Sequence, residues 1–228
     1  MSKPLKPGLE ADGAIRPTGR PSPTRDRVLE VACEVFAGAG FHGTCVREIC
    51  KRAGTNVAGV CYHFQSKEGL YQAVMMEAGR RLSEPDDGFV VSGELPPEQR
   101  LVKLVESLIQ RLSARGAWIA KLLARELVDA AGGPHNFAAS GLERDFVLLQ
   151  ALIREFLGAK ANGEAIRFNA LHVIGDCVAY CLARENPQHP LTQLAMDLPC
   201  RAHFARLVTQ GLLGALARED AEPEVSHP

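Results

Sequence analysis

Apolar positions in the first third of the chain repeat at spacings of three and four, which predicts short α-helices separated by turn residues. One such helix is expected at about residues 45–53, with Thr44 as its N-cap and Gly54 as the residue that ends it. Its apolar stripe consists of Val46, Ile49, Cys50 and Ala53.

A second short helix is expected directly after this turn. Asn56 is a good N-cap, and Val60 and Phe64 lie four residues apart, so both can face inward. The side chains then left mostly outward are those of Val57, Ala58, Gly59, Cys61 and Tyr62. Ser66 is the expected cap of a third helix, from residue 67 to about 82, whose inward positions are Leu70, Val74, Ala78 and Leu82.

Two short helices joined at a glycine turn form the layout of a helix-turn-helix, which places its second helix in the major groove of DNA. From Arg25 to Leu82 the chain resembles the N-terminal domain of the TetR family of bacterial regulators. The resemblance rests on VLEVACEVFAGAGF, GTCVREICKRAGTN and VAGVCYHFQSKEGLYQAV, in that order. Within the last segment, the family's signature positions are Tyr62, His63, Phe64, Ser66, Lys67, Glu68 and Leu70.

The sequence departs from its subgroup of that family at Cys61, which replaces an asparagine, and at Gly59, which weakens the reading helix by about 1 kcal/mol relative to alanine. Base preference therefore does not carry over from relatives. The alternative interpretation of residues 25–82 is a three-helix packing module without a nucleic-acid role.

The resemblance implies two groups of DNA contacts, because phosphate contacts position a protein and base contacts carry sequence. Expected phosphate contacts are Thr44, Tyr62, His63 and Lys67. Expected contacts to base edges are Asn56, Val57, Gly59 and Cys61, while Arg47 suits either group.

Residues 1–24 hold five prolines and little that can form a core, so a disordered basic arm is predicted. Arg16, Arg20 and Arg25 could reach an adjacent minor groove, and the alternative is a solvated tail without a role. Residues 219–228 are expected to form a disordered tail.

Residues 83–218 are predicted to form a helical bundle, which makes the whole chain all-α: a three-helix DNA-binding head and a C-terminal ligand-binding and dimerisation domain. The last two long helices are apolar on two sides. The resemblance implies that they meet a twofold mate in a four-helix interface, and the alternative is a monomer that encloses them. The expected interface residues are Ile174, Cys177, Cys181, Phe204, Val208, Gly211, Leu212 and Ala215.

The family also implies a small-molecule pocket between the bundle helices. The candidate wall residues are Leu104, Leu108, Trp118, Leu122, Phe137, Phe146, Leu149 and Ile153, and they would favour a hydrophobic effector. His172 and Asp176, four residues apart, could orient a polar group of that effector. Ordinary core packing and an intrahelical pair are the alternatives. The function implied is an operator-binding homodimeric repressor released by its effector, with activation as the alternative. The effector, the operator and the sign of regulation cannot be read from the sequence.

Composition supports a soluble regulator. The chain has 228 residues, 46% of them hydrophobic and 23% charged, and it contains no run of 18 apolar residues and no signal-peptide pattern, so a cytoplasmic protein without a membrane span is expected. Residues 1–82 hold twelve basic and eight acidic residues, whereas the remainder holds fourteen and nineteen. The part of the chain that contains the predicted head is therefore the basic part, which fits phosphate binding, and a chance difference between the two parts is the alternative.

Seven cysteines without a CxxC pair favour small buried thiols over a disulfide framework. Redox or metal sensing through Cys61 or through Cys177 and Cys181 is the alternative for signal input. No motif of a catalytic site is present, so no enzyme activity, cofactor or bound metal is expected, and a helical enzyme or interaction adaptor is the less favoured class.

Overall fold

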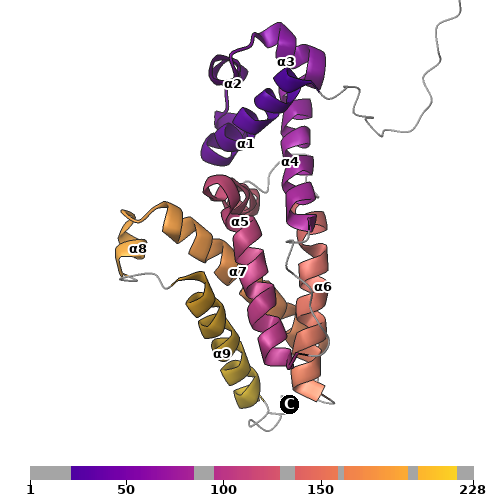
Figure 1. Cartoon of the computed structure of the whole chain (residues 1–228), viewed down its shortest axis with the longest axis vertical. Coiled ribbons are helices and arrows are strands. Elements are labelled where there is room, and N and C mark those ends of the chain that lie inside the picture. The colour runs from indigo at the N-terminus through magenta and orange to yellow at the C-terminus, as the bar shows by residue number, and fades with distance from the viewer. Residues whose placement is uncertain (1–21, 85–94, 129–136, 159–161, 195–199, 220–228) are drawn as a thin grey trace, which may run out of the picture.

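The computed structural model describes residues 22–84, 95–128, 137–158, 162–194 and 200–219, and every regular element within them is an α-helix, which confirms the all-α prediction. Figure 1 shows a small head formed by the first helices above an elongated helical body. The helices are α1 (Pro23–Gly43), α2 (Val46–Ala53), α3 (Val57–Phe64), α4 (Lys67–Ser83), α5 (Pro97–Val128), α6 (Phe137–Leu157), α7 (Gly163–Glu185), α8 (Pro190–Leu194) and α9 (Arg201–Glu219).

The first helix begins earlier than the sequence pattern predicts. The Ser22 hydroxyl accepts the Arg25 amide at 3.1 Å, and Pro23 fits the first turn because its missing N–H needs no partner there. The last two residues of the expected arm are therefore helical. Residues 1–21, Arg16 and Arg20 among them, lie outside the described part of the chain.

The helix α4 links the head to the body, so the expected domain boundary at residue 82 falls within its last turn (Figure 1). Its lower half crosses α6 at very short range. A Cβ added to Gly141 of α6 would lie 2.9 Å from the Cα of Gly79 and 3.1 Å from the Cβ of Leu82. Only glycine fits at this crossing without moving the backbone.

The helix α5 runs through the body and changes direction near its end, where Ala117 has a φ of 50°. This break directly follows Gly116. Beyond it, the Arg125 Nε donates to the Ala37 carbonyl at 2.9 Å, and its guanidinium also bonds the Gly38 carbonyl. α1 leaves helical geometry at Gly40, and carbonyls just before such a break lack intrahelical partners. Arg125 supplies donors there and ties the body to the head.

A buried ion pair joins three helices where α4 enters the body. The Arg111 guanidinium binds both carboxylate oxygens of Asp145 at 2.6 and 3.0 Å, and it also donates to the Leu82 carbonyl. Both side chains are almost fully buried. This network fixes the end of α4 against α5 and α6.

Candidate nucleic-acid interface

The turn between α2 and α3 has the geometry that the sequence predicts. Gly54 takes the left-handed conformation, with φ 64° and ψ 39°, and the Thr55 amide donates back to the Cys50 carbonyl at 3.0 Å. Asn56 caps α3, because its Oδ1 accepts the Gly59 amide at 2.8 Å. The two helices therefore form a helix-turn-helix.

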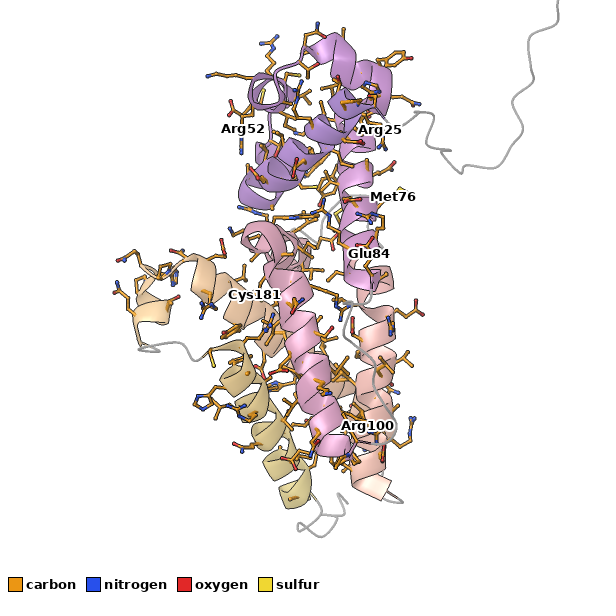
Figure 2. All side chains as sticks on the ribbon, in the orientation of Figure 1. Arg25, Arg52, Met76, Glu84, Arg100 and Cys181 are labelled. Atoms are coloured by element: carbon orange, nitrogen blue, oxygen red, sulfur yellow. The ribbon has the colours of Figure 1, made fainter. Side chains whose placement is uncertain are left out.

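The side chains of α3 divide between core and solvent as expected. Val60 and Phe64 are buried in the head. Val57, Ala58, Cys61 and Tyr62 are exposed, and 81% of the Tyr62 surface is open to solvent. The His63 ring lies edge-on to Tyr62 at 5.0 Å between centroids and is half-buried. Figure 2 shows side chains projecting freely from the end of the head that lies farthest from the body.

Cations border this exposed face. The Lys67 ammonium lies 4.7 Å from the centre of the Phe41 ring, and the Arg25 guanidinium lies 5.3 Å from that of Phe64. Such cation–π contacts hold the end of the Arg25 side chain against α3 and that of Lys67 against the end of α1. Arg47 is exposed near the start of α2.

The prediction that Thr44 caps α2 is wrong. Thr44 is buried at the end of α1, where its hydroxyl donates to the Gly40 carbonyl at 2.6 Å, and Cys45 occupies the N-cap position without a side-chain bond. The break at Gly40 leaves that carbonyl in need of a donor. The hydroxyl proton is thus committed, and Thr44 does not offer it to a phosphate.

The turn from α3 to α4 depends on Gly69. Gln65 has a φ of 66°, the Ser66 amide donates to the Phe64 carbonyl at 2.7 Å, and the Ser66 hydroxyl caps α4 by accepting the Gly69 amide. A Cβ at Gly69 would lie only 2.2 Å from the Phe64 carbonyl oxygen. The backbone therefore has to move before any side chain fits at position 69.

We expect Gly69→Ala to destabilise the chain by about 1–3 kcal/mol, as overpacking does, and to weaken DNA binding because it shifts α3. Urea unfolding and DNA titration measure the two effects. Gly38→Ala is a matched control, since a Cβ there meets nothing within 4 Å. Equal stability of the two variants would show that the turn relaxes freely.

The expected effector-pocket residues lie in the core of the body. Phe146 is partly buried, and the Phe137 side chain lies outside the described set, although the residue begins α6. The remaining wall residues, which are Leu104, Leu108, Trp118, Leu122, Leu149 and Ile153, are buried in one hydrophobic cluster. Whether an effector enters among them stays a prediction.

The structure reverses the predicted assignment of the two apolar faces of α7. Ile174, Cys177 and Cys181 were expected at a subunit interface, but they are buried within this chain, where Cys181 contacts the Ser113 hydroxyl of α5 at 3.3 Å. The exposed face holds Phe168, Leu171 and Gly175 instead. Both faces are apolar at helical spacing, so periodicity alone does not distinguish them. The polar residues His172 and Asp176 on the exposed face were the available signal.

On α9 the expected interface residues divide between the two sides. Leu212 is buried against the body, whereas Phe204, Val208, Gly211 and Ala215 are more open. Leu207 on the same helix is exposed as well.

A surface groove of about 430 Å³ runs between α7 and α9. His172 and Asp176 belong to this groove, 3.5 Å apart, so they do not face the buried side chains expected to line an effector pocket. Burial raises the pKa of the Asp176 carboxyl, and His172 opposes that shift. The groove is lined by Phe168, Asn169, His172, Val173, Asp176, Phe204, Leu207, Val208, Gly211, Leu212 and Ala215.

The cysteines proposed as sensors differ in accessibility. Burial raises the pKa of the Cys177 and Cys181 thiols, which disfavours the reactive thiolate. Cys61 is exposed on α3, as expected. Among the described residues, no group of three or more potential ligands could hold a metal ion.

Two families of known sequences match this chain. Residues 28–74 match the family described as bacterial regulatory proteins, tetR family, and residues 97–223 match the C-terminal domain of the HTH-type transcriptional dual regulator CecR. The first match covers the helix-turn-helix, and the second covers more than half of the chain.

Individual relatives agree with this assignment. The regulator UidR of Escherichia coli K12 is 39% identical over 70 residues, which are 29% of this chain and 36% of UidR, so the match spans about a third of that relative's length. A solved mutant of HlyIIR has a TM-score of 0.61 at 18% identity, covering 89% of this chain and 98% of its own. The fatty acid degradation regulator FadR of Bacillus halodurans has a TM-score of 0.60 at 21% identity, and the match covers 87% of this chain and 98% of FadR. These structures share the fold, and with the family matches they show that the chain belongs to the TetR family of DNA-binding transcriptional regulators, which are not enzymes.

Proposed function

We propose that this regulator acts as a homodimeric repressor, which binds an inverted-repeat operator and leaves it when a small hydrophobic molecule enters the body. The observation that carries the proposal is the uncovered apolar surface of α7 and α9. Phe168 is 67% exposed, and Leu171 and Leu207 are exposed beside it. Apolar surface of this kind marks a protein interface.

Two further properties of this surface support a second copy as its occupant. An added Cβ at Gly175, Gly211 or Gly214 meets nothing within 4 Å, so these glycines leave room for a close partner helix. A stretch of 18 residues within α7 has a mean hydropathy of 1.2, yet only 44% of that stretch is buried within this chain. Pairing two copies through α7 and α9 would bury the rest.

A dimer would present two copies of α3 to successive turns of DNA, about 34–36 Å apart. In this arrangement Tyr62, His63 and Lys67 bind phosphates, and Arg25 and Arg47 assist them. Arg20 would act from the N-terminal arm. The outward residues of α3 would meet the base edges.

The effector would release the DNA by shifting the equilibrium between two arrangements of the heads. The size of this shift is limited by the difference between the effector's affinities for the two arrangements. The contacts that join body to head are the candidates for carrying this shift. They are the Arg125 bonds to α1 and the Arg111 network at the end of α4. A change in the packing around α5 would therefore reach both helices that hold α3.

The proposal is tested by fluorescence anisotropy on DNA from upstream of the chain's own gene, compared with a scrambled fragment, in a salt series. Tighter binding to the native fragment with a steep negative salt slope supports an operator-binding regulator. Release of that DNA by hydrophobic candidates would identify the effector. Tight sequence-specific binding by a monomer would refute the dimeric part of the proposal.

Lys67→Ala should weaken binding to native and scrambled DNA by a similar factor, because a phosphate contact carries no sequence information, and it should reduce the salt slope by about two, one for each subunit of the dimer. Lys103→Ala is the matched control, since Lys103 is an exposed lysine on α5 in the body. A change of preferred sequence in Lys67→Ala would contradict this role.

A further inference from the structure

The first turn of the reading helix presents an apolar surface to its target. The eight residues of α3 have the sequence VAGVCYHF and include no arginine, lysine, amide, carboxylate, serine or threonine. Those are the side chains that usually form hydrogen bonds to base edges. The exposed members at its first turn are Val57, which is 44% exposed, and Ala58.

The polar residues that precede α3 are turned back onto it. Asn56 was expected to face base edges, but its Oδ1 accepts the Gly59 amide at 2.8 Å, so the cap already uses one of the two lone pairs of that oxygen and fixes the side chain against α3. The Thr55 hydroxyl lies over Gly59, only 2.7 Å from where a Cβ would stand. Both side chains therefore serve the start of the helix.

The first turn of a reading helix is the part that meets base edges in a helix-turn-helix. Here it offers the two methyl groups of Val57 and the methyl group of Ala58. The complementary group on the floor of the major groove is the C5-methyl of thymine, since the other edges there are hydrogen-bond donors and acceptors. If the Val57 methyl groups lay against base donors or acceptors, those polar groups would lose their hydration without gaining a hydrogen bond.

We propose that this regulator reads its half-site mainly through thymine methyl groups packed against Val57 and Ala58. This rests on the proposed function, in which α3 enters the major groove. Each contacted methyl should contribute roughly fourfold to affinity, the effect of burying one such group. Sequence discrimination at each position is then modest, and most affinity comes from phosphate contacts.

The test begins with the full-length protein and a pool of random DNA duplexes, from which bound sequences are selected. The selected half-site should contain thymines at the positions under α3. The best duplex is then made again with deoxyuridine in place of those thymidines, which removes only the C5-methyl groups. We expect the protein to bind the deoxyuridine duplex about fourfold more weakly for each contacted methyl.

Three variants separate methyl contact from other effects of the base change. Val57→Ala should reduce the ratio of affinities for the thymidine and deoxyuridine duplexes. Val147→Ala, at an exposed valine of α6 in the body, should leave that ratio unchanged. Lys67→Ala should weaken both duplexes and also leave the ratio unchanged.

Equal affinity for the two duplexes would overturn the inference, as would a ratio that Val57→Ala does not alter. A selected half-site dominated by guanine would overturn it too and would point to Arg47. Failure to select any sequence would instead refute the proposed function, and the inference would fall with it.

Discussion

Replacing Arg111 with leucine is expected to destabilise the chain by about 3–5 kcal/mol, the cost of leaving a buried charge without its partner. Asp145 is 1% exposed, and in this variant its carboxylate would lose both hydrogen bonds from the guanidinium. The Leu82 carbonyl would lose a donor as well. Urea unfolding at neutral pH, with and without the substitution, measures the loss.

The double variant Arg111→Leu/Asp145→Leu separates charge from packing. Because an apolar pair of similar volume removes the unpaired carboxylate, it should recover most of the lost stability. If Arg111→Leu alone unfolded at the same urea concentration as the parent chain, solvent would have to reach Asp145, and this network would not fix the end of α4.

The second large effect concerns assembly. Phe168→Glu changes an exposed residue, so the fold of one subunit should keep its stability to within about 0.5 kcal/mol. In the proposed dimer, however, the same change places two charges in an apolar interface. We expect a monomer, with operator affinity reduced by roughly 10²- to 10⁴-fold, because the two heads no longer bind as a linked pair.

Light scattering gives the oligomeric state of this variant, and anisotropy gives its DNA affinity. Val147→Glu is the matched control, because Val147 is a similarly exposed apolar residue, 57% open, that lies on α6 away from the groove. If Phe168→Glu remained dimeric, the subunits would have to meet through another surface.

The sequence predicted the parts of the head that depend on neighbouring residues. Gly54, Asn56 and Ser66 end or cap helices through bonds that reach five residues or fewer, so their roles follow from local chemistry. Thr44 was misplaced because the break at Gly40, four residues earlier, gives its hydroxyl a different partner.

Features that depend on distant segments were beyond sequence reasoning. Arg111 and Asp145 lie 34 residues apart, and Arg125 reaches α1 across 88 residues, so no local pattern brings these groups together. The faces of α7 illustrate a different difficulty. Both faces were recognised as apolar, but the choice of the inner one depends on how α5 packs against the cysteines.

The contact between Gly79 and Gly141 limits how this regulator can be recombined with others. Protein engineers who build new sensors exchange the DNA-binding part of one regulator for that of another, and a junction at residue 82 would leave α4 and α6 from different parents. Any side chain larger than hydrogen at position 141 would then press on the backbone of the new α4. Functional chimeras of this protein should therefore inherit these two helices together.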